Sequence, residues 1–316
     1  MMKSTGNGRL ECAATWRCKS TPATNYGCVF VTSRCARTTP RHQPAEPWKT
    51  SCAMPLRPQR TLTCLGVGDG HVAADRGHAA FLYEFGATRL LVDCGEPASQ
   101  TLLRTGARLE TLDRVFISHL HFDHVGGLFT LLQGLWLSRR QRPLTIHLPE
   151  PGLRPVQTLM RAARLFEVPS SFDLHWEPLR PWQPVPTGTG SVTPVPSSHL
   201  RALAVNPKAA RGRDGEAFSF LLEDRGCRVA HSADLGGLDD VPPLIREPLD
   251  LFVCELAHLE PADLFTRLRG HPIRQAVFVH LSADQWRQRR RWHARAARAL
   301  SPIPVHIPAD GERIAF

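Results

Sequence analysis

The chain has 316 residues, 42% of them hydrophobic, and a formal net charge of +10. This is enough apolar sequence for one large domain or two small ones. Most of the charge lies in residues 1–60, which carry ten Lys or Arg and two acidic residues, so residues 61–316 are nearly neutral and indicate no nucleic-acid partner by charge alone. Because no run of 18 apolar residues is present, we expect no membrane partner.

Residues 1–60 are rich in Thr, Ser, Arg and Pro and lack hydrophobic periodicity, which predicts a disordered basic extension before a single domain at 61–316. The extension is interpreted either as a transit peptide or as sequence before a natural start at Met54, and its scattered Cys and Trp favour the second. The first thirty residues lack the apolar core of a signal peptide, so we expect a cytoplasmic protein.

The nine cysteines contain no C-x-x-C pair, which argues against a zinc ribbon. Four cysteines each follow an apolar run, and we expect these to be buried free thiols on strands. They are Cys64, Cys94, Cys227 and Cys254. We therefore expect no disulfide bonds and a reducing compartment.

The regular elements begin after residue 60 and mix strands with helices. In the first half, the pattern predicts strands at 61–66, 112–118 and 143–148, a hairpin of 79–85 and 88–95 around Gly86, and helices at 125–138 and 152–166. In the second half, it predicts strands near 172–178, 191–196, 250–256 and 276–282, a hairpin of 217–223 and 227–233, helices at 261–269 and 283–299, and closing strands in PVHI and ERIAF. This order is typical of two sheets packed between helices.

Residues 117–127, ISHLHFDHVGG, place three histidines and one aspartate where the predicted strand 112–118 turns into a helix. His119 and His121 are two residues apart and point the same way on an extended backbone. They could bind one ion while Asp123 and His124 bind a second, and imidazole with carboxylate suits Zn²⁺, Mn²⁺ or Fe. The competing interpretation, an Asp N-cap beside solvated histidines, is disfavoured by three His within six residues.

Four ligands do not complete two ions, so single polar residues after apolar runs become candidates for the rest. They are His199 after VTPVPSS, Asp234 after CRVAHSA and His280 at the end of AVFVH. Each alone is more typical of a turn or core residue, and only the cluster makes it a candidate ligand.

The segment HLHFDH matches the H-x-H-x-D-H motif of the metallo-β-lactamase fold, and the resemblance covers residues 61–316 through LGVGDG, LLVDCGE, PSSHL, AHSADLG and VFVHLS. Motif order and spacing are most similar to the ribonuclease Z-like phosphodiesterase branch. The resemblance implies an α/β fold, a four-layer αβ/βα sandwich of two mixed β-sheets flanked by helices, with two Zn²⁺ ions, or Mn²⁺ or Fe in their place. It implies one ion on His119, His121 and His199, a second on Asp123, His124 and His280, and Asp234 as the bridge.

Two such ions can share a water as hydroxide, which attacks phosphorus or a carbonyl carbon, and Asp123 is expected to steer it. Asp93, in LLVDCG, is expected to orient the ligand loop. The leaving oxygen needs a proton, and His258 resembles the H-x-T histidine of ribonuclease Z by its spacing of 22 residues before His280. The Thr is absent, since the chain reads HLE, and Glu255 is the candidate for the family's Glu partner. The competing role for His258 is capping or packing.

Three functions follow. The first is a dinuclear phosphodiesterase acting on a small-molecule, nucleotide or RNA ester, and the second is a hydrolase of a carboxylic ester, lactone or thioester on the same site. The third, a non-enzymatic metal scaffold or nucleic-acid-binding relative, is disfavoured because every presumed ligand is present. The long basic arm that grips tRNA in ribonuclease Z is not seen, and the resembling branch makes a homodimer a further expectation.

Basic segments offer two places for an anionic substrate. The loop 201–214 follows His199 and carries Arg201, Lys208, Arg211 and Arg213, which makes it the better candidate. The other is the segment 286–298, with six Arg, Trp286 and Trp292, and such a run is more typical of a solvated helix face.

Overall fold

The computed structural model describes residues 60–165, 171–202 and 216–316, which all belong to one compact unit, Met54–Phe316. The expectations for the extension 1–60 and for the start at Met54 fall outside the described residues, apart from Arg60. Most of the loop 201–214 also falls outside them.

The first sheet has the strand order β14-β1-β2-β3-β4-β5-β6. Its strands are β1 (Arg60–Gly66), β2 (Ala80–Phe85), β3 (Thr88–Val92), β4 (Arg114–Phe116), β5 (Leu144–Pro149), β6 (Leu174–Leu179) and β14 (Arg313–Ala315). Strands β1, β2 and β3 pair antiparallel, whereas β3 to β6 pair in parallel, so the sheet is mixed. Gly86 turns the β2–β3 hairpin with a φ of 61°, which confirms the predicted hairpin.

The second sheet has the strand order β13-β12-β11-β10-β9-β8-β7. Its strands are β7 (Val185–Thr187), β8 (Gly190–Pro196), β9 (Phe218–Asp224), β10 (Cys227–His231), β11 (Leu251–Glu255), β12 (Ala276–Val279) and β13 (Val305–His306). Strands β7 to β10 pair antiparallel and β10 to β13 pair in parallel. The pattern missed β7, a short strand that contains Pro186, because proline within an apolar run argues against a strand.

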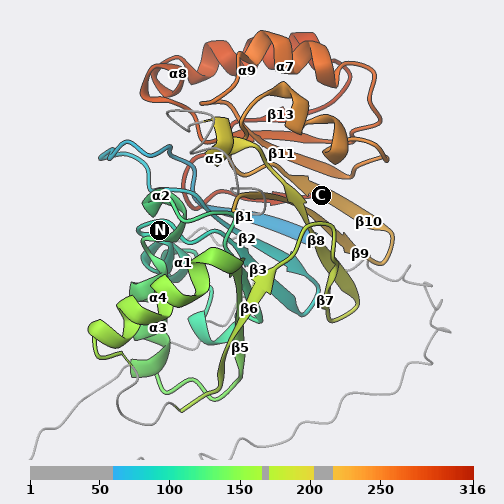
Figure 1. Cartoon of the computed structure of the whole chain (residues 1–316). Helices are drawn as coiled ribbons and strands as arrows, with labels where there is room; N and C mark the ends of the chain where they lie inside the picture. Colours follow the sequence, from blue (N-terminus) through green and yellow to red (C-terminus); the bar gives the residue numbers. More distant parts are fainter. Residues whose placement is uncertain (1–59, 166–170, 203–215) are drawn as a thin grey trace, which may run out of the picture. The chain divides into compact units, whose positions relative to one another are not determined.

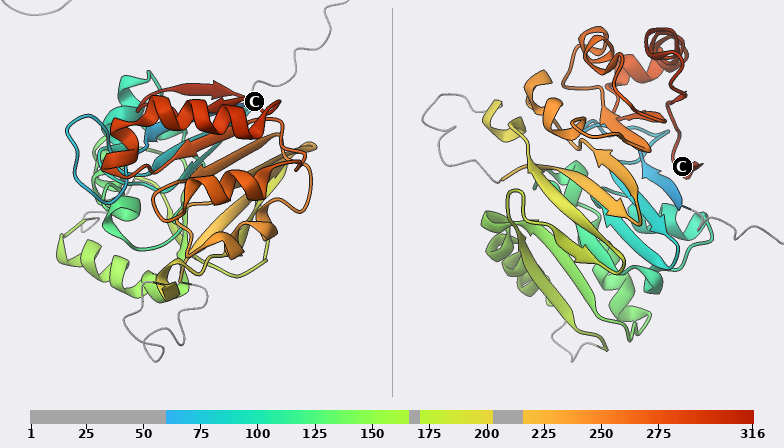
Figure 2. Two further views of the ribbon diagram at one scale, coloured as in Figure 1. Left: turned by 90° about the horizontal axis from the view of Figure 1, so that it is seen from above. Right: turned by 90° about the vertical axis from the view of Figure 1, so that its right-hand side faces the viewer.

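Helices cover the outer faces of both sheets, as Figure 1 and the right-hand view of Figure 2 show. Beside the first sheet are α1 (Ala98–Arg104), α3 (Leu128–Leu137) and α4 (Leu153–Ala162), and beside the second are α7 (Pro261–Leu268), α8 (Ala283–Arg287) and α9 (Arg289–Leu300). Two short helices, α2 (Phe122–Val125) and α5 (His199–Ala202), lie where strands end. The predicted four-layer sandwich is confirmed.

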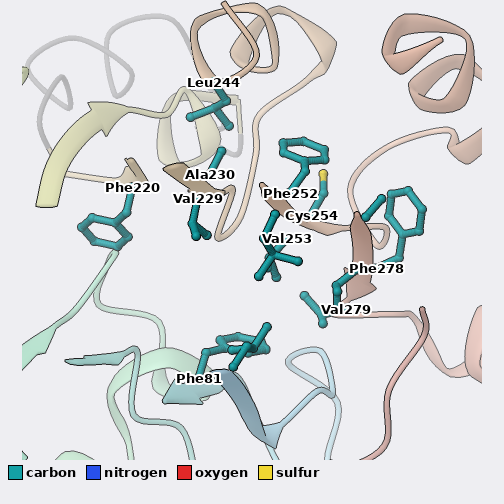
Figure 3. Close-up of a cluster of buried hydrophobic side chains, with 14 of the residues drawn as sticks. Phe81, Phe220, Val229, Ala230, Leu244, Phe252, Val253, Cys254, Phe278 and Val279 are labelled. Atoms are coloured by element: carbon teal, nitrogen blue, oxygen red, sulfur yellow. The ribbon is translucent and has the colours of Figure 1, made fainter. Parts of the chain in front are cut away.

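The inner core fills the space between the two sheets and continues through the second sheet to its helix-covered face, where Phe278 packs against Phe265 of α7 (Figure 3). Along β2, Phe81 and Tyr83 belong to this inner core, while Leu82 belongs to a second core beneath the helices of the first sheet. Both faces of the strand are therefore apolar, which explains why it appears in the sequence as a continuous apolar run. Each fully buried side chain of this size stabilises the fold by about 1.5–3 kcal/mol, and the resulting rigid frame holds the strand ends in place.

The predicted helix 125–138 is wrong at its start, because α2 ends at Val125 and α3 begins at Leu128. The break lies at Gly126–Gly127, where the Gly127 amide donates to the Cys94 carbonyl at 2.8 Å. A Cβ on Gly127 would lie 2.6 Å from the Gly95 carbonyl oxygen, so only glycine lets the chain pass this close to the end of β3. This contact attaches the histidine cluster to its neighbouring strand.

Candidate metal centre

Four strand ends converge to bring the presumed ligands together. Strand β4 leads to the cluster 119–124, β8 to His199, β10 to Asp234 and β12 to His280. Each ligand thus follows a buried strand, and the sheets set where each turn begins. The presumed ligand atoms form two groups, and Glu255 and His258 form a third possible group with His280; within each group all atoms lie within 4.8 Å of one another.

The first ligand group contains His119, His121, His199 and Asp234. The His199 Nε2 lies 3.3 Å from the His121 Nδ1 and 3.6 Å from the Asp234 Oδ2. The His119 Nε2 lies 3.9 Å from the same carboxylate oxygen. Three imidazole nitrogens and one carboxylate oxygen therefore face a common point.

The second ligand group contains Asp123, His124, His280 and again Asp234. The Nε2 atoms of His124 and His280 lie 3.3 and 3.2 Å from the Asp123 Oδ2. They lie 3.2 and 3.4 Å from the Asp234 Oδ1. Asp234 thus turns one oxygen toward each group, which is the arrangement expected of a bridging carboxylate.

The chemistry of these side chains fits a pair of divalent cations. Within the described part of the chain, His119 Nε2, His124 Nε2 and Asp234 Oδ1 are buried polar atoms without a hydrogen-bond partner. A buried polar group left unpaired costs about 1–3 kcal/mol, and three of them in one place require a compensating ligand. Burial lowers the pKa of His119 well below its usual range and that of His199 to about 4, so both imidazoles are neutral and able to coordinate.

Asp93 lies behind the second ligand group and is completely buried. Its carboxylate accepts from the Ser118 amide at 2.7 Å and from the Ser118 hydroxyl at 2.9 Å, and it lies 2.7 Å from the His124 Nδ1. Because the Nδ1 is occupied by Asp93, the Nε2 of His124 is left to face the metal position. These contacts are the ones expected of a residue that orients the ligand loop.

The backbone is strained beside the ligands. Asp93, Ala233 and His280 have positive φ values of 56°, 45° and 50°, in the left-handed region that favours glycine. Such residues cost about 1–3 kcal/mol each and persist where the surrounding structure holds them. Their position at the ends of β3, β10 and β12 shows that packing imposes the conformation that aims these turns at the centre.

His258 lies in the turn between β11 and α7, before the helix as predicted. Its Nδ1 is 3.1 Å from the Glu255 Oε1, and its amide donates to the Glu255 Oε2 at 2.9 Å. Burial lowers the pKa of His258, but the hydrogen bond and charge of Glu255 outweigh burial and raise it to about 9. The imidazole also lies beside the rings of His199 and His280, with centroids 4.7 and 5.6 Å away.

The segment 68–78 also borders the centre, and the sequence reasoning did not assign it a role. A Cβ on Gly70 would lie 3.5 Å from the Asp123 Oδ2, so the backbone passes directly beside that carboxylate. Asp69 holds the segment, since its carbonyl lies 2.8 Å from the His78 Nδ1 and its carboxylate 3.0 Å from the His71 Nδ1. The glycines of LGVGDG were the available signal, because they allow a close approach of backbone.

The arginine-rich segment forms α8 and α9, and its arginines are exposed. The predicted helix 283–299 is broken at Gln288. Trp286 is buried and donates its indole N–H to Asp75 at 2.7 Å, which connects α8 to the segment 68–78. Arg289 lies over the Trp286 ring, 4.6 Å from its centroid, as expected for a solvated cation–π pair.

The expected free thiols are confirmed for the described residues, because Cys64, Cys94, Cys227 and Cys254 are all buried and free. Cys94 differs from the expectation in lying just beyond β3 and not on a strand. In the described part of the chain, no helix is both long and apolar enough to cross a membrane.

The two-sheet sandwich with paired His/Asp groups at its strand ends defines a metallo-β-lactamase type of architecture. The chain belongs to the β-lactamase superfamily, because the model of the Beta-lactamase superfamily domain matches residues 88–307. Solved structures support the fold. YhfI from Bacillus subtilis aligns with a TM-score of 0.63 and 20% identity over 82% of this chain and 100% of that one. The short form of human tRNase Z aligns with a TM-score of 0.62 and 18% identity over 80% and 98%.

Curated relatives are named Ribonuclease Z. That of Bradyrhizobium sp. (strain ORS 278) is 33% identical over 159 residues, which is 50% of this chain and 48% of the relative. That of Halorubrum lacusprofundi is 41% identical over 91 residues, or 29% of each chain. The chain therefore spans about half the length, or less, of these relatives, and their activity is not transferred by similarity alone.

Proposed function

We propose that the protein is a dinuclear metal-dependent phosphodiesterase that hydrolyses a nucleotide or RNA-like ester. The observation that carries the proposal is the shared carboxylate of Asp234, which faces both ligand groups. The relatives named Ribonuclease Z and the fold neighbour described as a diphosphatase of the PhnP family support phosphate esters as the substrate class. Two bound cations would supply an activated water and would neutralise charge on the ester oxygens.

The chain itself contributes the geometry and the proton. Asp123 has its Oδ2 between His124 and His280, at the face of the second group, where it can accept a hydrogen bond from the attacking water and orient it. His258 has its Nδ1 against Glu255, so its Nε2 is the nitrogen that can give a proton to the leaving oxygen. With a pKa raised to about 9, His258 holds that proton at neutral pH. Glu255 acts as its positioning residue.

The leaving group provides the sharpest test of the proposal. Protein stripped with a chelator and reloaded with Zn²⁺ or Mn²⁺ is assayed on bis(p-nitrophenyl) phosphate and on a dinucleotide. The p-nitrophenolate ion leaves without a proton, whereas a ribose oxygen needs one. We therefore expect His258→Gln to lower kcat on the dinucleotide by roughly 10²–10⁴-fold and to change turnover of the nitrophenyl ester little.

His271→Gln is the matched control, since this histidine precedes β12 outside both ligand groups, and it should behave as wild type on both esters. If His258→Gln lowers kcat equally on both esters, His258 is not the proton donor to the leaving oxygen. If neither phosphate ester shows metal-dependent turnover but a lactone or thioester is hydrolysed, the protein is a hydrolase of carboxylic esters and not a phosphodiesterase.

A further inference from the structure

The Phe122 side chain is 76% exposed although it lies between two presumed metal ligands, His121 and Asp123. It occupies the first turn of α2, where the chain leaves the histidine cluster. A phenylalanine exposed to this extent contributes little buried apolar area to the stability of the fold. An exposed aromatic ring beside a reactive centre is therefore available to a ligand.

The most exposed large apolar side chain of the described residues lies on the other segment that borders Asp123. It is Val72, which is 91% exposed and two residues beyond Gly70, the glycine whose added Cβ would lie 3.5 Å from the Asp123 Oδ2. Phe122 directly precedes Asp123 in the chain and Val72 follows Gly70 by two residues, so each is carried by a segment that approaches this carboxylate. In Figure 1 the segment that carries Val72 passes beside α2.

The segment that presents Val72 is fixed by polar contacts on both sides of it. Asp69 and His78 hold its beginning and end, and Asp75 accepts the indole N–H of Trp286 at 2.7 Å. The Arg76 side chain is only 5% exposed and lies 5.3 Å from the centroid of the Trp286 ring. The exposed apolar side chain is therefore held on an anchored loop, which gives a ligand a preformed surface.

We propose that Phe122, with Val72 as a second apolar contact, forms a subsite that binds the planar base next to the scissile phosphate of the substrate. This inference rests on the proposed phosphodiesterase function, because the ligand groups would hold the phosphate while the ring takes the base. Stacking on an aromatic ring suits every base, since each base has a π face. One ring and one valine are too small for a protein partner, which needs about 800 Å² on each side.

The test compares two substrates that differ only in the base-bearing group. They are the p-nitrophenyl ester of thymidine 5′-phosphate and p-nitrophenyl ethyl phosphate, which share a leaving group and the chemical step. We expect Phe122→Ala to raise KM for the thymidine ester by roughly 5- to 150-fold, which corresponds to about 1–3 kcal/mol per stacked base. The ethyl ester should keep its wild-type kcat/KM, and Phe122→Tyr should retain the preference for the base.

Two measurements keep a folding defect apart from a lost subsite. The metal content of Phe122→Ala should equal that of wild type, and Leu137→Ala, which removes a 67% exposed side chain on α3, should change neither substrate. Calorimetric titration with thymidine 5′-monophosphate and with ethyl phosphate adds a readout independent of turnover. Wild type should bind the nucleotide more tightly, and Phe122→Ala should lose that difference.

The outcomes separate the subsite from the proposed function. Equal effects of Phe122→Ala on both esters, or none on either, overturn the base subsite while the phosphodiesterase remains. If Phe122→Ala loses activity only on aliphatic lactones or thioesters, the apolar surface binds an acyl chain, and the base subsite is overturned. If wild type hydrolyses neither ester, the proposed function fails, and equal affinity for nucleotide and ethyl phosphate would then reject the subsite as well.

Discussion

Replacing Asp93 by asparagine tests how the fold aims a ligand at its metal. The substitution keeps the size of the side chain but removes the charge and one of two acceptor oxygens. In the native protein the Asp93 Oδ1 accepts from the Ser118 amide, and the Oδ2 accepts from the Ser118 hydroxyl and lies 2.7 Å from the His124 Nδ1. The carboxamide introduced by Asp93→Asn cannot satisfy all three groups, so at least one buried group loses its partner.

The expected magnitude follows from the number and kind of these contacts. A hydrogen bond to a charged group contributes about 1.5–3 kcal/mol, and a buried group left without a partner costs about 1–3 kcal/mol. We therefore expect Asp93→Asn to destabilise the metal-free fold by roughly 2–5 kcal/mol. Loss of the orienting partner should also weaken the ion held by His124 by about 10- to 100-fold.

Competition with a chelator of known affinity measures the affinity for the first and for the second metal ion. Urea unfolding of the metal-free protein measures the free energy of unfolding. Asp113→Asn is the matched control, since Asp113 accepts the Arg89 amide at 2.7 Å outside the ligand groups. It should lose stability without losing metal affinity. If Asp93→Asn weakens neither ion, or the control weakens metal as much, the orienting role is refuted.

Two further predictions concern protons and packing. Burial lowers the pKa of His199 to about 4, whereas for His124 the Asp234 and Asp93 carboxylates outweigh burial and raise the pKa well above its usual range. On acidification, protons should therefore displace the ion of the second ligand group first. The measurement is metal analysis after dialysis at pH values between about 8 and 5. Loss of both ions at the same pH would contradict this prediction. Phe252→Ala, in the core of Figure 3, should destabilise the fold by about 3–5 kcal/mol in urea titrations, and a loss below about 1 kcal/mol would show that the core repacks.

The strands were predictable from the sequence because most are buried on both faces and appear as short apolar runs. A polar residue that ends such a run stands out, which is why His199, Asp234 and His280 were identified as ligand candidates before the structure brought them together. The resemblance of HLHFDH to a known motif supplied their division between two ions. The structure adds that each oxygen of Asp234 faces one of the two groups.

Other features of the site depend on tertiary contacts and could not be predicted from the local sequence pattern. The exposure of Phe122 could not be predicted, because the polar residues around it do not show whether a single aromatic ring at this turn packs inward or faces solvent. The contact between Gly70 and Asp123 joins two distant parts of the chain, and no periodicity encodes it. The helix break at Gly126–Gly127 depends on the close approach of Gly95, which likewise is a tertiary contact. Long-range packing decides such features, and a single sequence leaves it open.

A metal titration of chelator-stripped protein, with activity followed at each step, shows whether two ions bind at the centre around Asp234. We expect about two Zn²⁺ or Mn²⁺ per chain at saturation, with phosphodiester turnover appearing mainly with the second equivalent. His280→Ala, which removes a ligand of the second group alone, should stop at one ion and stay inactive. Saturation of the wild type at one ion, or full turnover with one ion bound, would rule out a dinuclear centre.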